Sequence, residues 1–256
     1  MDPAIRLRAK ISSRELTTGL LVTDHLWTDI VEIAQRSEVD YLIVDMEHGA
    51  AGTDLVAEVC ATGRRAGLPV LLRPRSNDYA AIRLAADLGP CGFLLASVDT
   101  AAELDVVRDA LFMPPRGRRR PGGMGNRWIR GYSATTWRAD FEEHFIVLPQ
   151  IETRVGLENL AEIAKHELTT AMAIGPYDLS AELGVCGEMT SPILRDALLT
   201  IRAAGEAAGK ATWMIGANAT GLVQDGWRFI CIGEPTWILA AALRDKVAQA
   251  RDALVQ

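Results

Sequence analysis

Short apolar runs alternate with longer amphipathic stretches along the chain. The apolar runs have the length and composition of buried strands and cover residues 17–23, 41–47, 69–75, 92–98, 145–152, 170–175, 211–216 and 228–233. The stretches after them have helical spacing and cover residues 27–38, 53–66, 78–89, 100–112, 154–166, 191–208, 217–226 and 235–254. Strands that alternate with helices in this way predict βαβ units and a parallel sheet.

Eight strand–helix units within 256 residues predict an α/β fold, a (β/α)8 TIM barrel that forms a single domain over residues 1–256. An open doubly wound sheet is the alternative. The first strand–helix junction, LLVTDHLW, lacks the glycine-rich turn that a dinucleotide site needs, so we prefer the barrel.

One long connection, residues 113–140, interrupts the rhythm between the fourth and fifth strands. Long irregular connections in compact domains often have a function. We interpret the segment as a lid over the active-site end of the barrel, and the alternative is a solvated basic loop or a subunit contact.

Composition narrows the function classes. A net charge of -6 and a 6% share of aromatic residues disfavour nucleic-acid binding. No run approaches the roughly 20 apolar residues of a membrane span, and the first residues, MDPAIRLRAK, lack the apolar core of a signal peptide. We therefore expect a cytoplasmic protein with a small-molecule substrate, in which the four scattered cysteines are buried free thiols: Cys60, Cys91, Cys186 and Cys231.

Polar side chains cluster where the predicted strands end, which is where TIM barrels carry their active sites. They lie at the ends of the second, third, fifth and sixth strands: Asp45, Glu47 and His48; Arg73 and Arg75; Gln150 and Glu152; and Gly175, Pro176, Tyr177 and Asp178. We expect these residues to converge on one mouth of the barrel.

Two of these residues predict a metal site. Glu152 and Asp178 come from neighbouring strands, and a carboxylate pair without His or Cys ligands suits Mg²⁺ or Mn²⁺. The alternative is an ion pair of a carboxylate with Arg73 or Arg75. All four lysines lie away from the strand ends, so Schiff-base chemistry has no candidate.

His48 is the histidine nearest a strand end, and we interpret it as a general base whose tautomer Asp45 fixes. A structural histidine at a turn is the alternative. Arg73 would supply positive charge where an oxyanion develops. Asp87 lies near a helix C-terminus, which is unfavourable for a carboxylate; either it has a partner elsewhere or it is a surface residue.

The motifs VDMEHG, LLRPRSNDYAAIRLAADLG, PPRGRRRPGG, LPQIET and IGPYDLSAELG occur in this order. Together they resemble the HpcH/HpaI aldolases, class II pyruvate aldolases such as those of 4-hydroxy-2-oxoheptanedioate and 2-dehydro-3-deoxyglucarate. The likeness runs from about residue 17 to the C-terminal helix. It implies a barrel that forms a homo-oligomer, hexameric or trimer-based, and a divalent cation (Mg²⁺, Mn²⁺ or Co²⁺) held by Glu152 and Asp178.

The resemblance also implies roles around that cation. Gln150 and the backbone of residues 175–177 would line the pyruvate site, and Arg73 would stabilise the enolate. His48, paired with Asp45, would move the proton.

Two further carboxylates gain roles in the same way. Glu47 would support the site, and Asp87 would reach the site of a neighbouring subunit.

The expected activity is reversible cleavage of a 4-hydroxy-2-oxo acid to pyruvate and an aldehyde through a metal-bound enolate. Alternatives are an oxaloacetate decarboxylase or other enolate-forming lyase on the same site, and a non-catalytic barrel that binds a 2-oxo acid. Departures from the family pattern at LLASVDT, GRRRPGGMGNR, Trp213 and GEPTW leave the aldehyde open.

Overall fold

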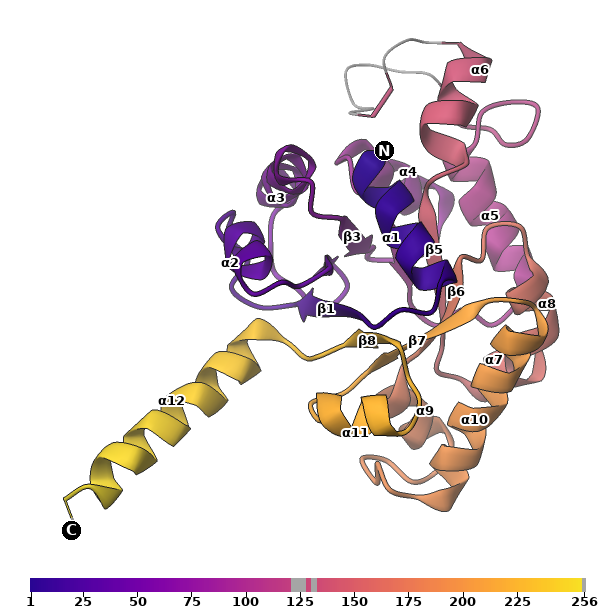
Figure 1. The fold of residues 1–256 in the computed structure, drawn as a ribbon. Helices are drawn as coiled ribbons and strands as arrows, with labels where there is room; N and C mark the ends of the chain where they lie inside the picture. The colour runs from indigo at the N-terminus through magenta and orange to yellow at the C-terminus, as the bar shows by residue number, and fades with distance from the viewer. Residues whose placement is uncertain (121–127, 130–132, 255–256) are drawn as a thin grey trace.

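Eight parallel strands form a closed barrel in the computed structural model, which describes residues 1–120, 128–129 and 133–254 (Figure 1). Each strand pairs with the next in the chain, and β8 pairs with β1. The predicted (β/α)8 barrel is therefore confirmed, as are all eight strands: β1 Thr17–Val22, β2 Tyr41–Asp45, β3 Val70–Arg73, β4 Gly92–Leu95, β5 Ile146–Ile151, β6 Ala171–Ile174, β7 Ala211–Ile215 and β8 Phe229–Cys231.

The helices follow the predicted alternation with four differences, one of which is a short helix with a π-helical turn within residues 113–140, predicted to be irregular. The other three are as follows. The predicted helix 154–166 is divided at Asn159, a helix follows β6 directly, and another precedes β1. The helices are α1 Asp2–Ser12, α2 Ile30–Arg36, α3 Thr53–Ala66, α4 Tyr79–Asp87, α5 Ala101–Leu111, α6 Ala134–Trp137, α7 Arg154–Glu158, α8 Leu160–Lys165, α9 Pro176–Glu182, α10 Pro192–Ala207, α11 Ala219–Gln224 and α12 Pro235–Asp252, with a π-helical turn at Arg138–Glu142.

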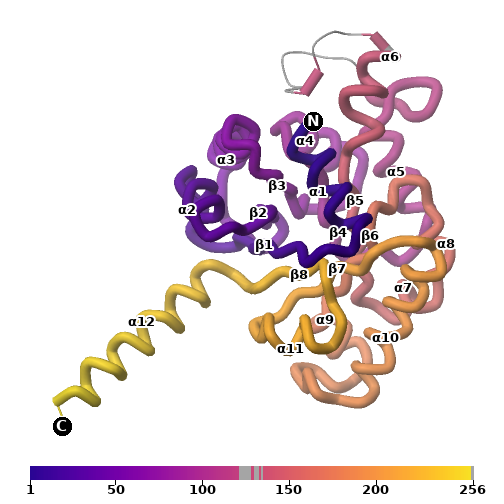
Figure 2. Tube along the Cα trace, in the orientation of Figure 1, coloured from indigo at the N-terminus to yellow at the C-terminus, as the bar shows by residue number. Residues whose placement is uncertain are grey.

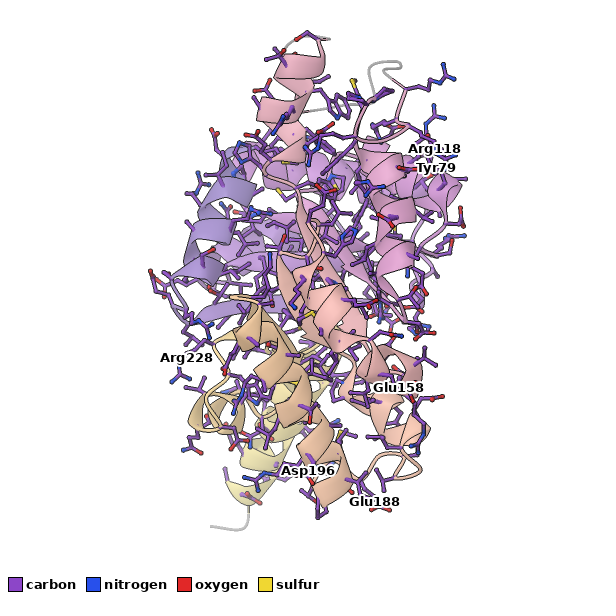
Figure 3. All side chains as sticks on the ribbon, turned by 90° about the vertical axis from the view of Figure 1, so that its right-hand side faces the viewer. Tyr79, Arg118, Glu158, Glu188, Asp196 and Arg228 are labelled. Atoms are coloured by element: carbon purple, nitrogen blue, oxygen red, sulfur yellow. The ribbon has the colours of Figure 1, made fainter. Side chains whose placement is uncertain are left out.

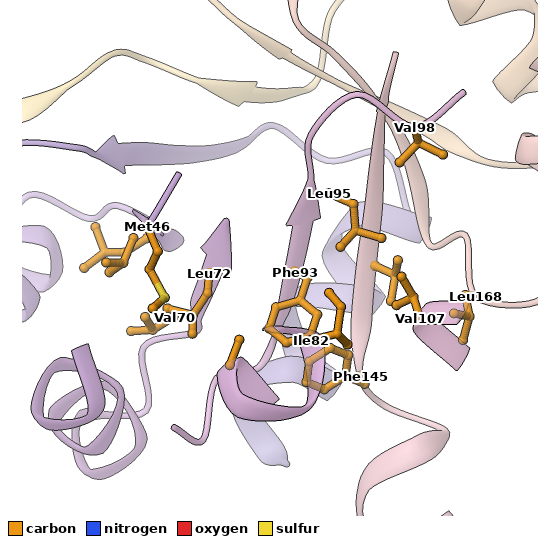
Figure 4. Close-up of a cluster of buried hydrophobic side chains, with 14 of the residues drawn as sticks. Met46, Val70, Leu72, Ile82, Phe93, Leu95, Val98, Val107, Phe145 and Leu168 are labelled. Carbon is orange, nitrogen blue, oxygen red and sulfur yellow. The ribbon is translucent and has the colours of Figure 1, made fainter. Parts of the chain in front are cut away.

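The period-two alternation of the strands divides the core into two layers. Along β3 and β4, Leu72 and Phe93 belong to the outer layer between sheet and helices (Figure 4), whereas Leu71 and Leu94 belong to the inner cluster. Trp213, one of the departures from the family pattern, fills this interior, where its Nε1 donates to the Tyr41 hydroxyl at 2.7 Å.

The helix α1 was missed from the sequence, and it closes the N-terminal end of the barrel. Its buried residues Ala4, Leu7 and Ile11 recur at helical spacing and join the inner cluster. Arg8 fixes the helix at that end, because it donates to the Phe145 carbonyl, just before β5, at 3.0 Å.

The prediction that residues 113–140 cover the active-site end is wrong for the residues that the structure describes. The Trp128 indole donates to the Pro90 carbonyl, just before β4, so it lies at the N-terminal end. The segment follows α5, which has already returned the chain to that end. Nearer α5, the Arg118 carbonyl accepts from the Tyr79 hydroxyl at 3.0 Å (Figure 3). Residues 121–127 and 130–132 lie outside the described residues.

The last helix, α12, extends away from the barrel (Figures 1 and 2), and none of its residues is buried. Its exposed side chains include Trp237 (72%), Leu239 (60%) and Leu243 (57%). Exposed apolar side chains gathered on one helix without a covering surface are unusual in a chain that stays monomeric. Within the described part of the chain, no helix combines the length and hydropathy needed to cross a bilayer.

All four cysteines are free thiols. Cys60, Cys91 and Cys231 are buried as predicted, and burial raises the pKa of each to about 12. The prediction is wrong for Cys186, which is exposed in the turn after α9.

Candidate active site

A cavity of about 400 Å³ opens at the C-terminal ends of the strands. Acidic, basic and hydroxyl side chains from β2, β3, β4, β5 and the β6–α9 junction share it. Its lining residues are Glu47, His48, Arg73, Ser97, Glu152, Thr153, Asp178, Ala181 and Glu182. The expected convergence of strand-end residues on one mouth is thus observed for five of these nine side chains: Glu47, His48, Arg73, Glu152 and Asp178.

The Arg73 guanidinium is fixed by Asp45, the last residue of β2. Its Nε and Nη2 donate to the two oxygens of that carboxylate at 2.8 and 2.5 Å, and both residues are buried. Burial would raise the pKa of Asp45, but the Arg73 hydrogen bonds and charge outweigh it and hold that pKa below its ordinary value. Burial opposes the charge on Arg73 too, and Asp45 and then Glu47 raise the pKa of Arg73 despite it. The cavity therefore has a permanent cation in one orientation.

The predicted role of Asp45 in fixing the His48 ring needs correction. Its oxygens also accept from the Thr23 hydroxyl at 3.0 Å and from the backbone N–H groups of Glu47 and His48. The carboxylate nearest the His48 ring is Glu47, with Oε2 at 3.9 Å from Nε2. Asp45 thus stabilises the turn after β2 and orients Arg73. The His48 side chain is 65% exposed and faces the cavity beside Glu47.

Glu152 lies just beyond β5 and is buried. Its Oε1 accepts two hydrogen bonds from Ser97, whereas its Oε2 has no hydrogen-bond partner among the described residues. Burial raises the pKa of Glu152, the Asp178 charge adds to that effect, and the Ser97 hydrogen bonds oppose it. A buried carboxylate oxygen without a partner is costly unless a ligand completes it.

Asp178 stands in the first turn of α9, close enough to Glu152 for the two charges to interact. Gly175, before this turn, makes room for the approach, because a Cβ there would lie 2.0 Å from Glu152 Oε2. Neither carboxylate forms an ion pair with an arginine of the described chain, in contrast to the alternative considered above. The pair is free to bind a cation.

This donor set fits a hard divalent cation. Among the described residues, no group of three or more His, Cys, Asp and Glu side chains is arranged to hold a metal. Two carboxylates alone suit Mg²⁺ or Mn²⁺, which complete their coordination with water or substrate oxygens.

Other predicted site residues lie outside the cavity lining. Arg75 is exposed, as is Tyr177, a residue that is 63% accessible. The Gln150 amide is buried next to Gly175, and its Oε1 has no hydrogen-bond partner among the described residues. Asp87 forms an ion pair with the buried Arg119 of its own chain, so it does have a partner.

Sequence reasoning missed four residues of the lining: Ser97, Thr153, Ala181 and Glu182. Ser97 was within reach, since it lies near the end of the fourth predicted strand, residues 92–98, but a lone serine carries little signal. Ala181 and Glu182 belong to α9, which was not expected. Thr153 follows Glu152 directly.

Comparison with known proteins gives a consistent result. A family model described as HpcH/HpaI aldolase/citrate lyase matches residues 26–240. A protein of Salmonella paratyphi B named 2-keto-3-deoxy-L-rhamnonate aldolase is 34% identical over 224 residues, 86% of this chain and 83% of the relative.

Solved structures share the fold. The HpcH/HpaI aldolase of Desulfitobacterium hafniense has a TM-score of 0.85 at 24% identity and covers 97% of this chain and 96% of that one. CitE of Mycobacterium tuberculosis, solved with magnesium, acetoacetate and coenzyme A, has a TM-score of 0.54 at 20% identity and covers 94% of this chain and 87% of that one.

Proposed function

The chain belongs to the HpcH/HpaI aldolase/citrate lyase family and is a lyase, and we propose that it cleaves a 4-hydroxy-2-oxo acid reversibly to pyruvate and an aldehyde. The observation that carries the proposal is that Arg73 lines the same cavity as the carboxylates of Glu152 and Asp178. A fixed cation beside a carboxylate pair suits a substrate that carries a carboxylate and a 2-oxo group.

In the proposed reaction, the His48 imidazole takes the proton of the 4-hydroxyl group. The C4–O electrons form the aldehyde carbonyl as the C3–C4 bond breaks, and the electron pair of that bond moves toward C2 and its oxygen. Arg73 stabilises the negative charge on this oxygen, and Asp45 holds Arg73 in place. Proton addition at C3 then gives pyruvate.

Glu152 and Asp178 would hold a divalent cation, Mg²⁺, Mn²⁺ or Co²⁺. When bound, the cation would orient the 2-oxo acid and act as a Lewis acid at its keto oxygen. The unpartnered Glu152 Oε2 and the nearby Asp178 charge support this assignment. The magnesium in the structure of the CitE relative agrees with it.

The experiment that tests the proposal combines chelation with product analysis. Exhaustive EDTA treatment should abolish cleavage, and Mg²⁺, Mn²⁺ or Co²⁺ should restore it. Oxaloacetate belongs in the substrate panel, because release of CO₂ from it without any aldol cleavage would favour a decarboxylase. Activity that survives chelation would exclude the metal role of the carboxylate pair.

The aldehyde half is proposed to be neutral. Among the described residues that line the cavity, the permanent cation is Arg73, which the proposed reaction uses at the 2-oxo group. Thr153, Ala181 and Glu182 offer no positive charge to a second carboxylate. A 2-keto-3-deoxy sugar acid, whose aldehyde half is uncharged, fits this part of the cavity, in agreement with the name of the Salmonella relative. Cleavage of 2-keto-3-deoxy-L-rhamnonate would give pyruvate and lactaldehyde.

Assembly into a homo-oligomer is part of the same proposal. The exposed apolar side chains of α12 support it, since this helix leaves its own barrel at the position where an eighth covering helix is expected (Figure 1). A second copy offers the same position, so two copies can exchange α12 about a two-fold axis. A cytoplasmic location is also proposed, supported by the four free thiols.

A further inference from the structure

Ser97, two residues beyond β4, has a backbone conformation that few serines adopt. Its φ of 49° lies in the left-handed region, which residues other than glycine, asparagine and aspartate rarely adopt. The next residue ties this turn to β5, because the Val98 N–H donates to the Gln150 carbonyl at 3.1 Å. The strained turn is thus held at a fixed position beside Glu152.

This conformation turns two donors toward a single oxygen. The backbone N–H and the hydroxyl of Ser97 both donate to Glu152 Oε1, each at 2.7 Å. Strain at a non-glycine position persists where the surrounding structure fixes it, and it is concentrated at functional sites. The two hydrogen bonds show that the turn holds the Oε1 atom of Glu152.

The other carboxylate oxygen of Glu152, Oε2, is available to bind a ligand. Glu152 Oε2 has no hydrogen-bond partner among the described residues, and it occupies the space where a Gly175 Cβ would be 2.0 Å away. Ser97 holds Oε1 and the Gly175 backbone lies close to Oε2, so the carboxylate cannot rotate freely. Oε2 is therefore the oxygen that can bind a cation together with Asp178.

We propose that Ser97 is a positioning residue that holds Glu152 so that its Oε2 alone binds the divalent cation together with Asp178. The inference rests on the proposed function of the carboxylate pair. Partners that orient a metal ligand typically contribute a factor of about 10–100 to metal affinity. Ser97 acts through Glu152 and needs no contact with the cation.

The test is direct binding of Mn²⁺, titrated by electron paramagnetic resonance of the free ion, to Ser97→Ala and Ser97→Gly. Both substitutions remove the hydroxyl, and glycine also accepts the left-handed backbone without strain. We expect each to bind Mn²⁺ about 10–100 times more weakly than the unsubstituted protein. Ser76→Ala is the matched control, because it removes a hydroxyl that donates to Asp78 at the same end of the barrel.

Glu152→Gln separates the two levels of the inference. If this variant loses Mn²⁺ binding while both Ser97 variants bind as tightly as the parent, the positioning role is wrong and the metal site stands. If Glu152→Gln also binds like the parent, the proposed metal site itself fails. Equal weakening by Ser76→Ala would show a nonspecific effect and would overturn the role of Ser97.

Discussion

At the scale of single residues, the most constrained group in the cavity is the guanidinium of Arg73. We expect Arg73→Lys to lower kcat about 10²–10³-fold, the usual effect of removing one preorganised donor to a developing oxyanion. A lysine keeps the charge but cannot donate two parallel N–H bonds to Asp45, so the charge loses its fixed direction. Steady-state cleavage kinetics measure the effect.

Arg75→Lys is the control for this substitution, since Arg75 follows the same strand but is exposed. Its kcat should remain unchanged. Near-parental kcat in Arg73→Lys would remove Arg73 from the mechanism, and equal losses in both variants would point to general damage.

Glu152 is predicted to lower the stability of the metal-free protein. Burial, with the Asp178 charge, raises its folded-state pKa above the unfolded value, so the folded state binds the proton more tightly. The free energy of unfolding therefore falls as pH rises through the interval between these pKa values, and the loss persists above it. Glu152→Gln should raise the Tm of the metal-free protein near neutral pH by roughly 2–4 °C for each kcal/mol regained.

Thermal unfolding in EDTA over a pH series measures this difference. The gain should shrink as the solution becomes acidic enough to protonate Glu152 in both states. A Tm difference that is absent at every pH, or that grows on acidification, would contradict the argument.

The sequence predicts where the chemistry of the site lies better than it predicts the contacts within it. The strand-end rule located Arg73 and Glu152 because it needs only the order of strands and polar residues. It paired Asp45 with His48, which is close in sequence, whereas the carboxylate binds Arg73 across the barrel wall. Such pairings depend on the register between β2 and β3, in which Asp45 lies opposite Arg73. A single sequence does not display that register.

At the scale of elements, α1 is expected to contribute stability as well as closure. Leu7 is 3% exposed and packs in the inner cluster, so Leu7→Ala should cost about 2–5 kcal/mol through lost burial and an unfilled cavity. Ile5→Ala is the matched control, since Ile5 lies on the outer side of the same helix and is 41% exposed. Urea unfolding measures both, and equal effects would show that α1 does not pack as described.

The strands were predictable because their apolar runs are short and regularly spaced, and every one of the eight is present. The errors at this scale arose from topology. Residues 113–140 were assigned to the active-site end although the predicted helix 100–112 comes between them and the fourth strand, and a helix reverses the chain direction. The spacing of Ala4, Leu7 and Ile11 carried a helical signal, but no preceding strand required a helix there.

At the scale of the whole molecule, the proposed exchange of α12 predicts that its exposed leucines control assembly. Leu239→Glu and Leu243→Glu should dissociate the oligomer, because a charge at a buried apolar contact is strongly unfavourable. Sedimentation velocity over a range of protein concentrations measures the change. Ile193→Glu, at a residue of α10 that is 54% exposed, is the control and should leave the assembly intact.

A parent protein that sediments as a monomer at all concentrations would contradict the proposed exchange. An oligomer that survives both leucine substitutions would show that copies associate through another surface.

The docking of α1 also has a consequence for biosynthesis. The side chains of α1 share the inner cluster with Phe229 and Cys231 of β8, so the helix before the first strand packs in the same cluster as the last strand. While the ribosome is still adding the middle strands, the apolar face of residues 4–11 has no complete surface to cover it. α1 and β8 are far apart in the sequence, and contacts between such distant residues form late because closing a long loop is entropically costly. The barrel therefore cannot close between β1 and β8, and α1 cannot complete its packing, until β8 has been synthesised.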